Sequence, residues 1–378
     1  MKPNIFILGG SPLQKDLLDS AKKRYTTYVI DGNEHCALVQ QADYFIHLDF
    51  SDTEKLYHAA LDKQPKLILT MASEPANLSA AIVSEKMGLP YNPVKTVKKT
   101  LNKLAMKECC EHNQIHTAKL QLAFDKIPDE NSLENLIFPC VLKPAQSSAG
   151  RGVFKADNKH QLLSAIPDAL QYSNNGFAMI ETLLSGTQYS VETISSHGKH
   201  HIIGITREFL GEPPYFAETQ QYFPAILTIQ QKANIETFVH QVLNAFHIEV
   251  GACHIEVRVD DSDQVTLIEI ASRIGGWRSE LIERAYGIRF TELLLDAHNG
   301  TLQFPTISQT DTYAVVKMIF NQANFEYYQV LKQDKRFVVS PITWLKETIS
   351  EKKNSLIDSS GYYFLTVLKQ EDLEDALH

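Results

Sequence analysis

The stretch Phe138-Pro-Cys-Val-Leu-Lys143-Pro-Ala-Gln-Ser-Ser-Ala-Gly-Arg-Gly152 leads from a β-rich run through a lysine into a loop of small residues. Val141 and Leu142 predict a strand that ends at Lys143. The loop residues with little side-chain bulk are Ser147, Ser148, Gly150 and Gly152. Backbone N–H groups of such a loop can approach an anion closely, and the lysine adds a positive charge beside them. The pattern indicates a phosphate-binding loop, while a glycine–serine loop on its own also fits an ordinary hairpin connection.

A second constellation begins more than a hundred residues later, at His254-Ile-Glu256-Val-Arg258. Polar and apolar residues alternate there, and a turn-like run precedes Val265-Thr-Leu-Ile-Glu269-Ile, so the segment predicts a β-hairpin. The period of two places His254, Glu256 and Arg258 on one face, and a short connection brings Glu269 close to Glu256. Two converging carboxylates near a phosphate loop outline a nucleotide–Mg²⁺ site.

An arginine and two glycines follow this hairpin directly, in Ser272-Arg273-Ile274-Gly275-Gly276. The guanidinium of Arg273 can hold a phosphate or a carboxylate through two parallel hydrogen bonds. A surface salt bridge is the alternative for this position.

Together with the segment Glu181-Thr-Leu-Leu184, these motifs resemble the ATP-grasp superfamily of carboxylate–amine and carboxylate–thiol ligases in order and spacing. The resemblance implies that Lys143 contacts phosphate from the lid, and that Lys103 is the earlier nucleotide lysine at the start of a helix. Lys107 is then expected on a solvated face. Glu181 and the backbone from Thr182 to Leu184 are implied to meet the adenine edge, and Gln188, where the family usually has glutamate, to bind the ribose.

The resemblance implies bound ATP with Mg²⁺ or Mn²⁺ on Glu256 and Glu269, and catalytic roles for Lys143 and Arg273. The family usually has asparagine two residues after the second metal glutamate, and here that position is Ala271. Alanine cannot bind a metal ion, so water fills the vacancy or one of two metal ions is held weakly.

Residues implied near the acid and amine substrates form a separate set: Glu192, Arg207, Glu218 and Arg278. A Gly-His pair that the family usually has near Glu218 is Gln220-Gln221 here. Arg278 is a candidate carboxylate clamp, with a surface ion pair as its alternative.

The predicted fold class is α/β and α+β, in several domains, because 378 residues with 44% hydrophobic content exceed one ordinary core. Residues 1–93 predict a doubly wound α/β domain that resembles the one preceding the grasp in such ligases. Residues 94–300 would be the two-lobed grasp, with its lid at about 116–185, and 301–378 a small β-rich closing domain.

Composition restricts the partners. A net charge of −9 argues against nucleic acid or an anionic membrane surface, and no apolar run is long enough to span a bilayer. Five cysteines without Cys-x-x-Cys spacing suggest neither zinc nor disulfides and fit a reducing cytoplasm. Small-molecule acids and amines are the implied partners, and a homodimer is an open alternative because ligases of this size in the family are often dimers.

The resemblance therefore implies an ATP-dependent, ADP-producing ligase that joins a small acid, an amino acid in the leading hypothesis, to an amine through an acyl phosphate. Two alternatives remain open. One is a purine-pathway or carbamoyl-phosphate type of reaction with bicarbonate as the acid. The other is a module that binds ATP without catalysis, which the departures at Ala271 and Gln188 suggest.

Overall fold

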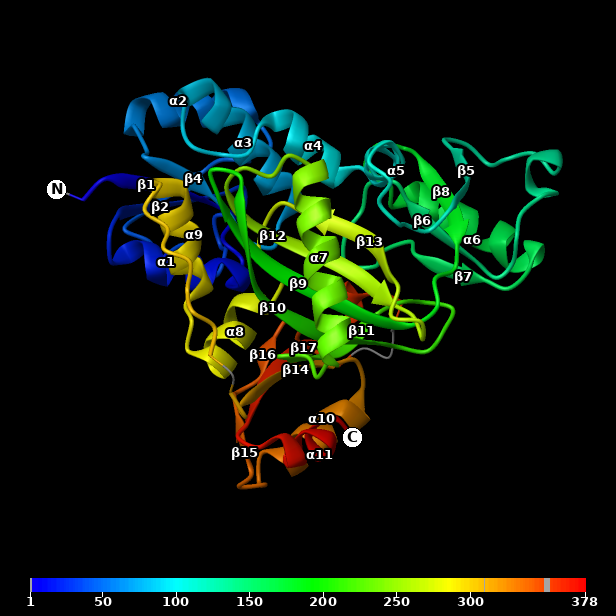
Figure 1. Cartoon of the computed structure of the whole chain (residues 1–378). Coiled ribbons are helices and arrows are strands. Elements are labelled where there is room, and N and C mark those ends of the chain that lie inside the picture. The colour runs from blue at the N-terminus through cyan, green and yellow to red at the C-terminus, as the bar shows by residue number, and fades with distance from the viewer. Residues whose placement is uncertain (1, 309, 350–353) are drawn as a thin grey trace.

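The computed structural model describes residues 2–308, 310–349 and 354–378. The chain builds an N-terminal α/β unit, a projecting lobe with its own four-stranded sheet, and a nine-stranded sheet that runs through the centre of the molecule (Figure 1). This architecture confirms the predicted mixture of α/β and α+β parts.

The N-terminal unit is a parallel sheet in the order β3-β2-β1-β4. Its elements are β1 (Asn4–Leu8), α1 (Lys15–Lys22), β2 (Thr26–Asp31), β3 (Tyr44–His47), α2 (Thr53–Lys63), β4 (Leu67–Leu69) and α3 (Glu74–Met87). Ile5 and Ile7 pack toward α1, whereas Phe6 and Leu8 pack toward α2 and α3. Both faces of β1 are therefore apolar and covered by helices, which confirms the doubly wound prediction.

Two short helices lead from this unit into the projecting lobe: α4 (Val94–Leu101) and α5 (Lys103–His112). Asn102 ends the first helix and caps the second, since its side chain accepts the backbone N–H groups of Leu104 and Ala105. The lobe is an antiparallel sheet in the order β5-β8-β6-β7, with one helix against it. Its elements are β5 (Leu120–Phe124), β6 (Cys140–Pro144), β7 (Phe154–Ala156), α6 (Lys159–Gln171) and β8 (Ala178–Thr182).

The central sheet has the order β13-β12-β9-β10-β11-β14-β17-β15, with β16 paired to β17. The strands of its first half are β9 (Thr187–Ser196), β10 (Lys199–Leu210), β11 (Glu218–Phe223), β12 (Gly251–Val259) and β13 (Val265–Ala271). The helices beside it are α7 (Ile229–Ala245), α8 (Arg278–Tyr286) and α9 (Phe290–Asn299). Alternate strand residues pack toward α7 on one face and toward α8 and α9 on the other.

The C-terminal residues extend the same sheet. Their elements are β14 (Tyr313–Ile319), α10 (Gln322–Leu331), β15 (Phe337–Val339), β16 (Thr343–Trp344), β17 (Gly361–Val367) and α11 (Leu373–Leu377). β14 pairs with β11, so the strands expected in this part of the sequence continue the central sheet instead of starting a separate one.

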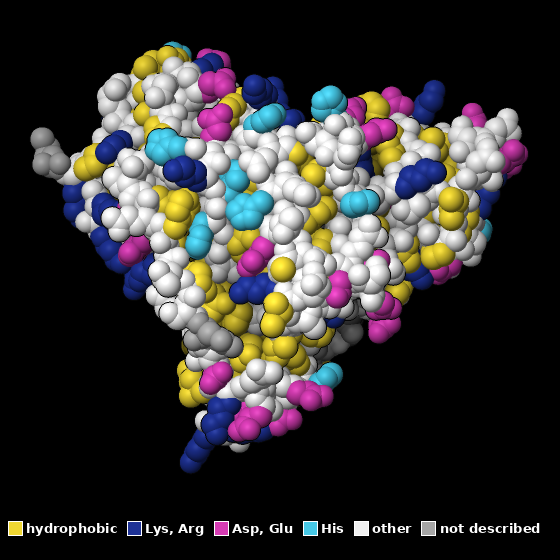
Figure 2. All heavy atoms as spheres, in the orientation of Figure 1, with side chains coloured by type: hydrophobic (Ala, Val, Ile, Leu, Met, Phe, Trp, Pro, Cys, Tyr) yellow, Lys and Arg dark blue, Asp and Glu magenta, His cyan; other side chains and the backbone are white. Residues whose placement is uncertain are grey.

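On the face shown in Figure 2, Lys and Arg side chains are interspersed with Asp and Glu. None of the helices in the described ranges combines the length and the apolar character that crossing a membrane requires.

The contact between the N-terminal unit and the central sheet includes a buried histidine on α9. His298 is 5% exposed, its Nδ1 donates to the backbone oxygen of Leu294 at 3.0 Å, and its ring lies 5.4 Å from the ring of Tyr91. Burial disfavours the charged imidazolium and lowers the pKa of His298 to about 4.

This burial predicts a pH-dependent loss of stability. The pKa of His298 is about 4 in the folded protein and 6.5 in the unfolded reference. The stability that the buried neutral imidazole contributes is therefore complete above pH 6.5 and is lost as the pH falls toward 4. We expect the free energy of unfolding of His298→Gln, measured with urea, to be below that of the wild type at pH 7. The difference in the free energy of unfolding between the wild type and the variant should narrow by about 2 kcal/mol between pH 7 and pH 4.5. A difference that is constant with pH would contradict this assignment.

Candidate active site

A cleft lies where the projecting lobe faces the central sheet. Most of the residues expected at the nucleotide and its metal ion line it: Lys103, Lys143, Ser147, Ser148, Gly150, Glu181, Thr182, Leu184, Gln188, Glu256 and Glu269. Glu218, expected near the substrates, lines it too. Apolar side chains join them, among them Val141, Leu210, Phe216 and Ile268. The structure thus brings together groups that can bind an anion and an apolar surface on which a flat ring can pack.

Lys143 stands at the end of β6 and is buried. Its Nζ donates to Glu181 at 2.5 Å, and the other oxygen of Glu181 lies 2.8 Å from Lys107. Burial alone would raise the pKa of Glu181, but the two ammonium groups outweigh this effect and hold it below its ordinary value. Glu181 therefore fixes two lysines at the cleft.

The expectation that Lys107 is solvated is wrong. Its side chain is buried, and its Nζ also donates to Thr117 Oγ1 and to the backbone oxygen of Ala118 at 2.7 and 2.6 Å. Burial lowers the pKa of Lys107, which Glu181 partly offsets. Spacing within the helix could not reveal this partner, because Glu181 comes from a strand more than seventy residues away.

The small-residue loop has the backbone that close approach to an anion requires. Ala149, Gly150 and Gly152 have positive φ. Ser147 Oγ is buried without a hydrogen-bond partner among the described residues, and the backbone oxygen of Ser147 accepts from Lys103 Nζ at 3.1 Å. Gly152 is outside the cleft lining; a Cβ there would lie 2.9 Å from Pro144 Cγ, so its role is close packing.

Arg258 links the segment that follows β8 to the central sheet. Its guanidinium donates to the backbone oxygens of Leu184 and Gly186, both at 3.2 Å, and to Gln188 Oε1 at 3.4 Å. Gln188 in turn donates to Glu208 at 2.7 Å. The side chain expected at the ribose is thus already oriented by two charged neighbours.

The predicted hairpin is confirmed, and Glu256 lies directly opposite Glu269 in the β12–β13 ladder. Lys103 lies 2.8 Å from Glu269 and, against the effect of burial, lowers the pKa of that glutamate to about 2. Burial and the charge of Glu269 raise the pKa of Glu256. Two facing carboxylates beside a loop with an unpartnered serine fit a Mg²⁺–nucleotide group.

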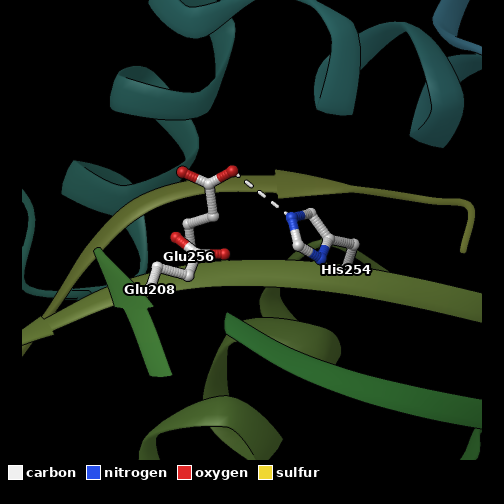
Figure 3. Close-up of side chains that lie close together, drawn as sticks. All are labelled: Glu208, His254 and Glu256. Carbon is white, nitrogen blue, oxygen red and sulfur yellow. Dashed lines mark hydrogen bonds and ion pairs between the residues drawn. The ribbon is translucent and has the colours of Figure 1, made fainter. Parts of the chain in front are cut away.

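A second, more buried cluster adjoins the glutamate pair. His254 Nδ1 donates to Glu192 at 2.5 Å, and its Nε2 lies 3.3 Å from Glu256 (Figure 3). Burial would lower the pKa of His254, but Glu192 and Glu256 raise it to about 10. His254 is therefore a buried cation in this arrangement.

Arg278 is the other cation of this cluster. The alternative of a surface ion pair is wrong for this residue, because its side chain is buried. It is 2% exposed and donates to Glu208, to Gln221, and to Ser190 Oγ at 3.1 Å. Glu218 lies 4.0 Å away. Burial and the neighbouring Glu208 raise the pKa of Glu218 to about 8.

The structure corrects the placement of Arg207. Its guanidinium stacks on the rings of Tyr189 and Phe209, on the opposite face of the sheet from the cluster. Successive strand residues point to opposite faces, so Glu208 takes the inward position instead. Sequence analysis missed Glu208, although the alternation that places Gln188 and Glu192 on one face applies equally to β10.

Arg273 also lies away from the cleft lining. Its Nη2 is 2.5 Å from Glu74 at the start of α3, and its Nε is buried without a partner among the described residues. It therefore joins the hairpin to the N-terminal unit in this structure.

Comparisons with known proteins agree on the fold. The ATP-grasp domain family matches residues 136–280. An L-amino acid ligase from Bacillus licheniformis has a TM-score of 0.81 and 19% identity, covering 99% of this chain and 96% of that one. N5-carboxyaminoimidazole synthetase from Staphylococcus aureus, solved with ADP, has a TM-score of 0.77 and 18% identity, covering 100% and 97%.

A curated relative in sequence is formate-dependent phosphoribosylglycinamide formyltransferase from Prochlorococcus marinus, subspecies pastoris. It is 29% identical over 196 residues, which is 50% of this chain and 50% of the relative. The chain spans about half the length of the first curated relatives that it matches.

The lysine pair around Glu181 yields a stability prediction. Glu181→Gln leaves two buried ammonium groups without a carboxylate, and we expect the free energy of unfolding to fall by about 3 kcal/mol. Denaturant unfolding at pH 7 measures this loss. The matched control is Glu54→Gln, which breaks an exposed ion pair with Lys86 and should cost under about 1 kcal/mol. Equal losses in both variants would refute the structural role of Glu181.

Proposed function

From the membership of residues 136–280 in the ATP-grasp family, we propose that this chain is an ATP-dependent ligase joining a small acid, in the leading case an amino acid, to an amine. The observation that carries the proposal is the adjacency of two unlike sites where the projecting lobe faces the central sheet. Facing glutamates, buried lysines and the phosphate loop form one, and a buried Arg278 among carboxylates forms the other.

The first site suits a nucleoside triphosphate. Lys103, Lys143 and the loop N–H groups would spread the charge of the migrating phosphoryl group, and a Mg²⁺ ion held by Glu256 and Glu269 would neutralise more of it. The apolar residues of the cleft would face the base. The acid would attack the γ-phosphate to give an acyl phosphate and ADP, and the amine would then displace phosphate.

The second site suits a zwitterion. The guanidinium of Arg278 can hold a carboxylate, while Glu208 and Glu218 offer acceptors for an ammonium group. This pairing favours an amino acid over bicarbonate, which has no cationic end. The bicarbonate reaction remains the second candidate because the fold is nearly as similar to a carboxyaminoimidazole synthetase, with a TM-score of 0.77, as to the L-amino acid ligase, with 0.81.

We propose the division into residues 1–93, 94–300 with a lid at about 116–185, and 301–378. Small-molecule acids and amines in the cytoplasm are the proposed partners, and a homodimer the proposed assembly.

The direct test is Mg²⁺-dependent ADP release from ATP, measured against a panel of amino acids, small carboxylates and bicarbonate, each with and without amines. We expect stimulation by one acid–amine pair, and its loss in Glu256→Ala plus Glu269→Ala, since both metal carboxylates are then gone. Tight ATP binding with no stimulated turnover by any pair would favour a module that only binds the nucleotide.

A second test separates the acid site from the nucleotide site. Arg278→Lys keeps the charge but removes the planar fork, so we expect kcat/KM for the stimulating acid to fall about 100-fold while the KM for ATP stays within a few-fold. The control is Arg284→Lys on the same helix, where the guanidinium pairs with Glu280 near the surface. Equal effects of the two substitutions would contradict the assignment of Arg278.

A further inference from the structure

We propose that Glu208, His254 and Glu256 bind a second divalent metal ion, of the transition series, separate from the Mg²⁺ between Glu256 and Glu269. Glu256 would be shared by the two positions. The inference concerns the protein's own metal content and holds whether or not the ligase activity is as proposed.

The three donors converge from two strands that flank β9. One ligand atom of each residue lies within 4.8 Å of the others, and Figure 3 shows the carboxylates and the imidazole gathered on one side of the strands. Ligands at about 2.1 Å from a metal ion are themselves roughly 3 to 4 Å apart. Small side-chain rotations are therefore enough to close the site.

The surroundings orient each donor as the environment of a metal site does. Glu192 accepts from His254 Nδ1 and is itself fixed by the backbone N–H of Gly275 at 3.2 Å. This carboxylate–histidine pair directs Nε2 toward Glu256, and an ion bound there would displace the Nε2 proton, because only the neutral imidazole is a metal ligand. Glu208 accepts from Arg278 and Gln188, which leaves further lone pairs for a cation.

The balance of charge also calls for a cation. Four carboxylates lie in this cluster: Glu192, Glu208, Glu218 and Glu256. In the described part of the chain, their ion-pair partners are Arg278 and His254 alone. Two cations thus face four carboxylates in a buried region, where carboxylates are expected to be paired, protonated or bound to a metal ion.

The donor set selects the kind of ion. An imidazole with two carboxylates suits Mn²⁺, Zn²⁺ or Fe²⁺ better than Mg²⁺, which prefers oxygen alone. Ala271 lies opposite His254 in the β12–β13 ladder and has no side-chain ligand atom. Of these two residues, only His254 can bind the ion through its side chain. An ion here would lie between the nucleotide site and Arg278, where an acid oxygen can reach it.

The test uses Mn²⁺ alone with the purified chain, without nucleotide. Pulsed electron paramagnetic resonance should show one bound Mn²⁺ per chain that is coupled to an imidazole nitrogen. The coupling should vanish in His254→Gln and persist in His298→Gln, which removes another buried histidine. Bound Mn²⁺ without nitrogen coupling, no bound Mn²⁺, or coupling retained in His254→Gln would each overturn the proposal.

A second variant protects the test if His254→Gln does not fold. Glu192→Gln keeps the shape and the hydrogen-bond acceptor but weakens the orientation of the ring, so Mn²⁺ affinity should fall about 10- to 100-fold. An unchanged affinity, with nitrogen coupling retained, would mean that the pair with Glu192 has no part in binding the ion and would overturn the proposal. ADP release is not measured in this experiment, so failure of the proposed ligase function would be seen separately.

Discussion

The pairing of β9 between β12 and β10 is the constraint on which the site depends. Its register sets His254 against Glu192 on one side and Glu192 against Gly204 on the other. Because strand residues alternate between faces, a slip of one residue would move Ser190 and Glu192 into the apolar layer that Tyr189 and Val191 occupy. The same register that buries the core thus aims the polar side chains at the cleft.

The polar face is expensive to bury, and the structure offsets the cost by pairing across elements. Glu181 forms ion pairs with two lysines, Lys103 pairs with Glu269, and Arg278 pairs with Glu208. A buried ion pair contributes little net stability compared with apolar packing, since desolvation consumes most of its Coulomb energy. So many of them in and beside one cleft are better explained by the binding of charged substrates than by stability. The raised pKa values of Glu218 and Glu256 mark where this compensation is incomplete.

Sequence reasoning recovered the features that depend on local pattern. The hairpin that brings Glu256 to Glu269 and the doubly wound N-terminal unit follow from periodicity and turn residues, while the helix start at Lys103 came from the family resemblance. It failed where a partner is distant in the chain. The burial of Lys107 depends on its ion pair with Glu181. Which of Arg207 and Glu208 lies on the face of the buried cluster depends on how β10 pairs with β9. Neither the pairing of distant strands nor its register can be read from spacing within a single segment.

The segment after Glu269 shows how the N-terminal unit becomes part of the site. Ser272 accepts from Asn77 of α3 at 3.0 Å and lies 3.0 Å from Thr100 of α4, while Arg273 pairs with Glu74. These contacts fix the end of β13, and hence Glu269, to a unit outside the central sheet. A displacement of α3 would break the ion pair between Arg273 and Glu74 and would disturb the end of β13 that carries Glu269. The position of the N-terminal unit therefore controls the geometry of the glutamate pair, although apart from Lys103, just beyond that unit, the residues that line the cleft come from the lobe and the central sheet.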